Sequence, residues 1–280
     1  MEERPIIALI YDFDKTLCTT DMQNYSFIPN LGLEPAEFWN KCGELSEKTN
    51  CEKILSYMYT MISESKRAGI KLTREYLNSL GNKIEYFPGV ETWFRRINKI
   101  GEDLGFQVEH YIVSSGTKEI IEGTSIYKEF KAVYGCEFMY DDETQEAIWP
   151  ALAINYTAKT QYFYRISKGA LNPNDDAGVN QKKLNRRVPY ENMIYFGDGM
   201  TDIPAMILTK NNGGTSIAVY QEGQKHKVTN LYEDGRVNFV SLADYSKNSD
   251  LEKVVQLIIQ KIALNNQLSI KEEKLYTKER

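Results

Sequence analysis

The sequence contains few of the residues that build histidine or cysteine metal sites. The chain of 280 residues has only two histidines, so a histidine-rich metal site is not expected. Its four cysteines follow no metal-ligand spacing, and in a chain of this length they indicate free thiols in a reducing, cytoplasmic compartment. No run approaches the roughly 18 apolar residues of a membrane span, and we expect no signal peptide.

Basic charge is also scarce. The net charge is −5, from 34 basic and 39 acidic residues, so the chain has no overall positive surplus for binding a nucleic-acid backbone. The segment from Lys182 to Arg187 is a candidate basic patch, but such clusters are usually solvated loops. We therefore expect neither nucleic acid nor a membrane as a partner.

Short apolar runs alternate with helical patterns through most of the chain. Runs that fit buried parallel strands occur at residues 6–11, 111–113, 132–134, 193–196 and 215–219. Helical spacing separates most of them, at residues 90–100, 116–124 and 203–208. Strands that alternate with helices predict an α/β fold with a doubly wound parallel sheet.

Two stretches interrupt this alternation. Residues 17–87 have helical periodicity without a clear buried strand, and we interpret them as a helical cap inserted after the first strand. In residues 137–154, the polar segment 140–144 could turn a hairpin.

The rest of the chain divides around the cap. Residues 1–16 and 88–250 are predicted to form a discontinuous α/β core, in which the polar residues 172–188 indicate a surface loop. Residues 251–280 are predicted to form an amphipathic helix and a charged tail, whose last ten residues are expected to be disordered.

Carboxylates follow the first and fourth apolar runs. Asp12 and Asp14 come directly after the first, and residues two apart in an extended chain point to the same side. The carboxyl end of a strand in an open α/β sheet is where ligands bind. Two carboxylates this close resist joint ionisation unless a cation is bound or one keeps a proton. Asp198, between two glycines, would add a third carboxylate for a hard cation such as Mg²⁺.

Hydroxyl and amine side chains complete the pattern. Ser114 ends the second apolar run, and Ser115 and Gly116 lead into a predicted helix start, where free N–H groups favour a phosphate. Lys159 lies between the third and fourth runs and could neutralise a carboxylate or a phosphoryl group. Lys118 and Lys168 are alternatives for this lysine.

Taken in order, these residues resemble the motifs of the haloacid dehalogenase superfamily. The matching segments are Asp12-x-Asp14-x-Thr16, Ser114 after its strand, a lysine, and Gly197-Asp198-Gly-x-x-Asp202. Each alone is modest evidence, but their joint order is hard to obtain by chance. The resemblance spans residues 6 to about 219 and is nearest to the phosphoserine-phosphatase-like branch with a helical cap. An Ala-Lys pair that opens a helix favours Lys159 as the third motif.

The resemblance implies a Mg²⁺-dependent phosphohydrolase that cleaves a small phosphorylated metabolite through an aspartyl-phosphate. Asp12 would be the nucleophile and Asp14 the general acid and base. Asp12, Asp198 and the backbone carbonyl of Asp14 would bind Mg²⁺, while Lys159 would stabilise transition-state charge.

Neighbouring residues would support this chemistry. Ser114, Ser115 and Gly116 would orient the phosphate, and Asp202 would hold Lys159 or a metal-bound water. Thr16 is expected to belong to the substrate-binding loop and to stabilise it.

The cap would set the substrate. Asp21 lies where phosphoserine phosphatases carry the acid that binds the substrate amine, although an exposed aspartate is the simpler interpretation. Lys66 and Arg67 could bind a substrate carboxylate or form a solvated helix face. Three aromatic residues are candidate cap core: Trp39, Tyr57 and Tyr59.

Three other functions stay open, of which a purely structural interaction protein is the weakest. A phosphotransferase or phosphomutase would use the same intermediate with another acceptor. A non-catalytic regulatory protein that binds a phosphate ligand would usually have lost one of the three carboxylates. The C-terminal helix leaves both a monomer and a homodimer possible.

Overall fold

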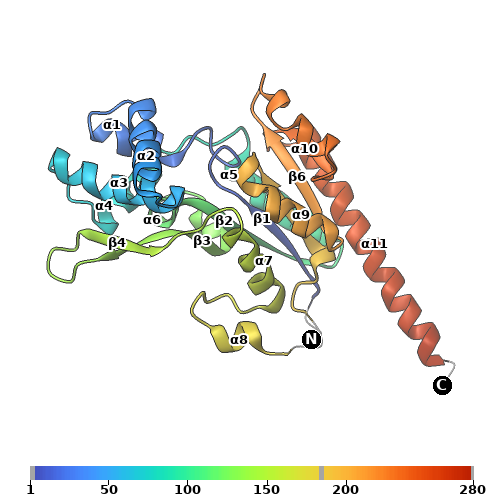
Figure 1. Ribbon diagram of the computed structural model, residues 1–280. Coiled ribbons are helices and arrows are strands. Elements are labelled where there is room, and N and C mark those ends of the chain that lie inside the picture. The colour runs from blue at the N-terminus through green and yellow to red at the C-terminus, as the bar shows by residue number, and fades with distance from the viewer. Residues whose placement is uncertain (1–3, 183–185, 279–280) are drawn as a thin grey trace.

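The computed structural model describes residues 4–182 and 186–278, which are built on a seven-stranded sheet (Figure 1). The strands are β1 (Ile6–Tyr11), β2 (Gln107–Thr117), β3 (Phe130–Tyr140), β4 (Ala147–Leu152), β5 (Met193–Gly197), β6 (Thr215–Tyr220) and β7 (Phe239–Leu242). Their order is β4-β3-β2-β1-β5-β6-β7, and all neighbours are parallel except β3 and β4. The α/β class and the doubly wound sheet are therefore confirmed, with one antiparallel edge strand.

Helices connect the strands and fill the insertion after β1. The insertion contains α1 (Phe27–Asn30), α2 (Pro35–Thr49), α3 (Lys53–Ala68) and α4 (Arg74–Leu80). The other helices are α5 (Val90–Asp103), α6 (Lys118–Glu122), α7 (Ala158–Lys168), α8 (Asp176–Asn180), α9 (Ile203–Asn211), α10 (Thr229–Glu233) and α11 (Asp250–Lys278). Within the described ranges, no helix combines the length and the apolar character that a membrane crossing requires.

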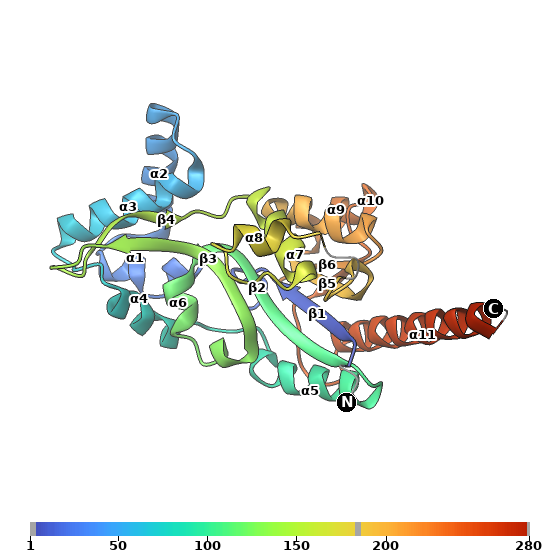
Figure 2. The same ribbon diagram turned by 90° about the horizontal axis from the view of Figure 1, so that it is seen from below.

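The central strands are apolar because helices cover both faces of the sheet. In β5, Phe196 contacts Trp93 of α5, with ring centroids 6.4 Å apart, while the preceding Tyr195 contacts Phe163 of α7 at 5.0 Å. Successive strand residues point to opposite faces. α5 and α11 thus cover one face, and α7 and α9 cover the other (Figure 2).

The helical segment 17–87 lies beside the carboxyl ends of β1 and β2, next to the hairpin of β3 and β4 (Figure 1). This hairpin lies within residues 137–154, where the polar segment 140–144 was predicted to turn it. The backbone N–H of Ala147 in β4 donates to the carbonyl of Leu72 at 2.8 Å. The insertion therefore shares a backbone hydrogen bond with a core hairpin, and the division into core and cap stays a prediction.

Local differences from the predicted elements have simple causes. β2 continues to Thr117, so the helix predicted to start at Gly116 begins only at Lys118. β7 was not predicted, because its four residues are half-exposed and make no buried apolar run. α11 continues helically to Lys278, through residues that were expected to be disordered.

The polar segment 172–188 is not wholly a loop, because α8 interrupts it. The basic patch predicted there lies partly outside the described residues. Of its described members, Arg187 forms an ion pair with Glu109 at 2.6 Å and the Arg186 guanidinium lies 5.2 Å from the ring centroid of Tyr190. Both arginines are therefore engaged within the protein.

Candidate active site

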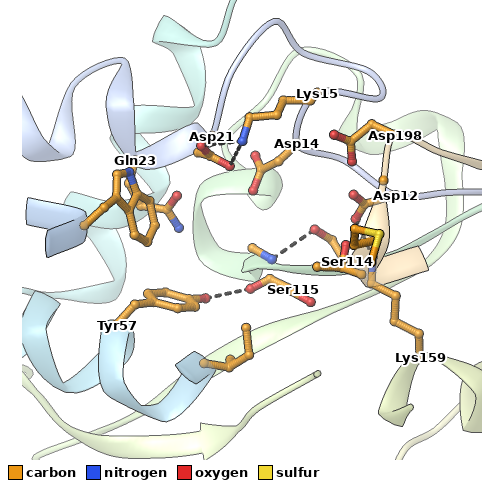
Figure 3. Close-up of a pocket in the computed structure, with 16 residues that line it drawn as sticks. Asp12, Asp14, Lys15, Asp21, Gln23, Tyr57, Ser114, Ser115, Lys159 and Asp198 are labelled. Carbon is orange, nitrogen blue, oxygen red and sulfur yellow. Dashed lines mark hydrogen bonds and ion pairs between the residues drawn. The ribbon is translucent and has the colours of Figure 1, made fainter. Parts of the chain in front are cut away.

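Asp12 and Asp14 follow β1 where the sheet reverses its order of strands, and both line a cavity of about 260 Å³ (Figure 3). The backbone N–H of Asp12 donates to the carbonyl of Phe196 at 2.9 Å, which extends the ladder between β1 and β5. Asp14 Oδ1 accepts a hydrogen bond from the backbone N–H of Met22 at 2.8 Å. The intervening Phe13 is fully buried. The structure thus brings the two carboxylates to one cavity.

The turn after β5 supplies Asp198 to the same cavity. Oxygens of Asp12, Asp198 and Asp202 lie within 4.8 Å of one another. Asp202, however, accepts from the Tyr195 hydroxyl at 2.6 Å and from the backbone N–H groups of Asp198 and Gly199 at 3.0 and 3.3 Å. Because these donors occupy Asp202, Asp12 and Asp198 are the carboxylates left to hold a cation.

Lys159, in the first turn of α7, lies fully buried between two carboxylates. Its Nζ donates to Asp12 at 2.9 Å and to Asp202 at 2.6 Å. The two alternative lysines lie elsewhere: Lys118 forms an ion pair with Glu137, and Lys168 donates to backbone carbonyls. Lys159 is therefore the lysine that meets the carboxylate cluster.

The cavity is electrostatically short of positive charge. Burial raises the pKa of Asp12 to about 6, although Lys159 opposes the shift. Burial and neighbouring aspartates raise the pKa of Asp14 and of Asp198 well above the ordinary carboxyl value. A bound cation or retained protons would relieve this repulsion, and hard oxygen ligands of this kind fit Mg²⁺.

The end of β2 forms the floor of the cavity. Ser114 is fully buried, and its Oγ accepts from the backbone N–H of Gly116 at 3.0 Å. Ser115 Oγ is buried and has no hydrogen-bond partner among the described residues. A Cβ at Gly116 would lie 2.9 Å from Asp14 Oδ2, so a larger residue would crowd this carboxyl. The orphan hydroxyl and the open backbone suit a group with many acceptor oxygens.

Other predicted residues divide between the cavity and the rest of the protein. Asp21, Trp39 and Tyr57 line the cavity. Tyr59 and Arg67 are exposed outside it, and Arg67 forms an ion pair with Glu64.

Thr16 does not line the cavity either, because its side chain is fully buried. Its backbone carbonyl accepts from the Tyr245 hydroxyl at 2.8 Å. This contact fits the predicted role in stabilising the loop rather than a role in contacting substrate.

Sequence reasoning missed Lys15, which lies over the cavity opposite Tyr57 (Figure 3). Its backbone has φ of 57°, in the left-handed region, and its Nζ forms an ion pair with Asp21 at 2.7 Å. Its place between Asp14 and Thr16 was a signal that the sequence offered. Gln23 and Ile54 also line the cavity, and only the packing of the helical segment puts them there.

Comparison with known proteins agrees with this architecture. Residues 9–206 match the family model of the haloacid dehalogenase-like hydrolases. An uncharacterized protein of Borreliella burgdorferi is 30% identical over 292 residues, which cover 94% of this chain and 99% of that protein.

Solved structures share the fold at low sequence identity. A substrate-bound phosphoserine phosphatase complex matches with a TM-score of 0.57 and 15% identity, over 91% of this chain and 99% of that one. A probable phosphoserine phosphatase of Vibrio cholerae matches with a TM-score of 0.57 and 10% identity, over 94% and 67%. A HAD family hydrolase of Salmonella enterica serovar Typhi matches with a TM-score of 0.52 and 16% identity, over 80% and 66%.

Proposed function

The chain belongs to the haloacid dehalogenase-like hydrolases, and we propose that it is a Mg²⁺-dependent phosphatase that cleaves a small phosphomonoester. The observation that carries the proposal is the meeting of Asp12, Asp14 and Asp198 in one cavity beside a buried lysine. A regulatory protein that only binds a phosphate ligand would have no need of all three carboxylates, whose mutual repulsion is unfavourable.

The proposed reaction has two steps. A carboxylate oxygen of Asp12 attacks phosphorus, and the bond from phosphorus to the leaving alcohol oxygen breaks, which leaves an aspartyl-phosphate. Asp14 donates its proton to that alcohol oxygen, and its raised pKa supports this role because it favours the protonated form. Asp14 then takes a proton from a water molecule as the water oxygen attacks phosphorus. Inorganic phosphate leaves, and the Asp12 carboxylate is restored.

The surrounding residues would orient the phosphate. Ser114, Ser115 and the backbone at Gly116 line the cavity beside Asp14. In this proposal the buried, unpartnered Ser115 hydroxyl would turn toward a phosphate oxygen. Lys159 would hold the Asp12 carboxylate in position and offset negative charge in the transition state.

The carboxylates also fit a resident Mg²⁺ ion. Asp12 and Asp198 would hold it, together with the backbone carbonyl of Asp14 as the family resemblance implies. When bound, Mg²⁺ would stabilise negative charge on the phosphoryl group.

Phosphate release from an aryl phosphate and a panel of phosphorylated metabolites tests the proposal. We expect turnover that needs Mg²⁺, stops in EDTA and is lost in Asp12→Asn, because asparagine keeps the shape and removes the nucleophilic charge. Asp103→Asn, at an exposed site in α5, is the matched control and should keep full activity. Turnover that survives in Asp12→Asn would refute Asp12 as the nucleophile. Transfer of phosphate to an added alcohol instead of water would identify a phosphotransferase.

The compartment is part of the same proposal. All four cysteines are free, and Cys18, Cys42 and Cys136 are buried. Unpaired thiols support a reducing, cytoplasmic location. Labelling of this protein in intact cells by a reagent that reaches only the periplasm would contradict a cytoplasmic location.

A further inference from the structure

The side of the cavity formed by the helical segment, which would receive the leaving alcohol, combines aromatic and apolar side chains with Asp21 and Gln23. Trp39 and Ile54 line it, together with Asp21, Gln23 and Tyr57 (Figure 3). The rings of Trp39 and Tyr57 meet with centroids 6.0 Å apart at 65°. The Tyr57 hydroxyl donates to the Ser115 carbonyl at 2.7 Å, and Trp39 Nε1 donates to Asn24 at 3.0 Å. Because their polar groups are occupied, these two residues offer mainly ring surface to a ligand.

The cations of this cavity already have partners. Among the described residues, Lys15 and Lys159 are the cationic side chains that line it. Lys159 is buried against two carboxylates. Lys15 Nζ lies 2.8 and 2.7 Å from the two carboxylate oxygens of Asp21, with 41% and 29% of the two side chains exposed (Figure 3). An anionic group on the leaving alcohol would therefore meet no unpaired cation within this lining.

Lys15 occupies a backbone conformation that favours glycine. With φ at 57°, a non-glycine residue is strained by roughly 1 kcal/mol or more, and glycine would adopt the same backbone freely. Strain that persists beside a cavity points to a use for the side chain. The use visible here is the ion pair that fixes both Lys15 and Asp21 at the mouth of the cavity.

From these observations we propose that the Lys15–Asp21 pair selects phosphomonoesters whose leaving alcohol carries no second anionic group. The inference rests on the phosphatase function proposed above and names its substrate class. A carboxylate or second phosphate on the alcohol would have to displace Asp21 from Lys15, or lose water beside Asp14 and Asp21 without an unpaired side-chain cation of the lining to meet it. Uncharged and cationic alcohols avoid this cost and can pack on the two rings.

Matched substrate pairs test the selectivity directly. Phosphoethanolamine and phosphoserine differ only by a carboxylate, as do phenyl phosphate and 4-carboxyphenyl phosphate. For the wild-type protein with Mg²⁺, we expect kcat/KM to be about tenfold or more higher for the carboxylate-free member of each pair.

Variants of the ion pair assign the effect to its residues. Asp21→Asn keeps the side-chain shape and frees Lys15, so the preference should fall by about fivefold, mainly through a lower KM for the carboxylate-bearing substrates. Lys15→Met removes the cation, so those substrates should bind no better than to the wild type. Asp103→Asn breaks the exposed Lys99–Asp103 pair far from the cavity and should leave the preference unchanged.

The outcomes separate this inference from the phosphatase proposal. A wild-type preference near unity in both pairs would overturn the inference and leave the phosphatase function standing. An unchanged preference in folded Asp21→Asn, checked by circular dichroism, would also overturn it. Failure of the wild type to hydrolyse any member of either pair or any compound of the wider panel would count against the phosphatase function instead. The wild-type comparison needs no variant, so it decides even where a variant fails to fold.

Discussion

Lys159 offers the sharpest test of how the site is held together. Its Nζ is fully buried between Asp12 at 2.9 Å and Asp202 at 2.6 Å. Lys159→Met keeps the side-chain length but leaves two buried carboxylates without their cation. Removing one partner of a buried ion pair costs about 3–5 kcal/mol. In a chain of this size that loss lowers Tm by roughly 10 °C, which differential scanning calorimetry in EDTA would measure.

The same substitution should lower kcat by about 10²- to 10³-fold, because preorganised charge beside the reacting group is lost. Lys168→Met is the matched control, since Lys168 is a buried lysine of the same helix that donates to backbone carbonyls. It should lose stability while kcat stays within a few-fold of wild type.

A double variant separates folding from catalysis at Lys159. Lys159→Met with Asp202→Asn removes one buried charge together with its cation, so part of the lost stability should return. Activity should stay low, because Asp12 still lacks its lysine. If phosphate release recovers in step with Tm, Lys159 serves folding alone and the catalytic reasoning is refuted. An unchanged Tm in Lys159→Met would refute the buried ion pair itself.

Three other measurements test separate parts of the structure. Folded Asp12 takes up a proton near its raised pKa of about 6 whereas the unfolded chain does so near the ordinary value of 3.8, so protonation stabilises the metal-free protein as the pH falls. The gain in Tm from Mg²⁺ should therefore shrink between about pH 8 and pH 5, and a gain that grows would contradict this. Gly123→Ala should cost about 1–3 kcal/mol in urea unfolding, because its Cβ would lie 1.7 Å from a carbonyl oxygen of α4. Gly43→Ala in α2, with nothing within 4 Å, should be neutral or stabilising, and equal effects would refute the packing argument. Truncation after Asn266 removes a segment whose described side chains, at residues 267–276, are exposed, and it should leave Tm unchanged. Truncation before Leu251 also removes buried residues and should lower Tm. If truncation before Leu251 leaves the size-exclusion elution class unchanged, a dimer formed through α11 is excluded.

The parts of the fold that could be predicted are those in which burial requires a local run of apolar residues. β1 and β5 are covered on both faces, so their apolar runs were visible in the sequence. β7 is half-exposed and has no buried apolar run. Asp12 and Asp198 were predictable because a carboxylate directly after a buried strand must lie at the edge of the sheet.

The wall of the cavity opposite these carboxylates was not predictable in the same way. Trp39 lies on α2 and Tyr57 on α3, and only the packing of the two helices turns both rings toward the cavity. The ion pair of Lys15 depends on a left-handed backbone that no residue pattern announces. Thr16 was expected near substrate because it belongs to the motif, but the turn after Asp14 directs it into the core.

The case for a functional site does not depend on motif resemblance alone, because three features that each destabilise a fold occur together in one cavity. Lys15 carries backbone strain, the Ser115 hydroxyl lacks a partner, and burial disfavours the charge on Asp14. The other described non-glycine residues with positive φ are Asn50, Gln145 and Asn248, and none of them lines the cavity. Asparagine tolerates this conformation, and Gln145 lies in the turn between β3 and β4. Strain, unsatisfied hydrogen bonding and buried charge weaken a fold by separate mechanisms, so their coincidence is not a by-product of packing. A metal ion and a phosphate group would relieve the charge and the missing hydrogen bond together, and this shared remedy is the physical reason to assign the cavity to phosphoryl chemistry.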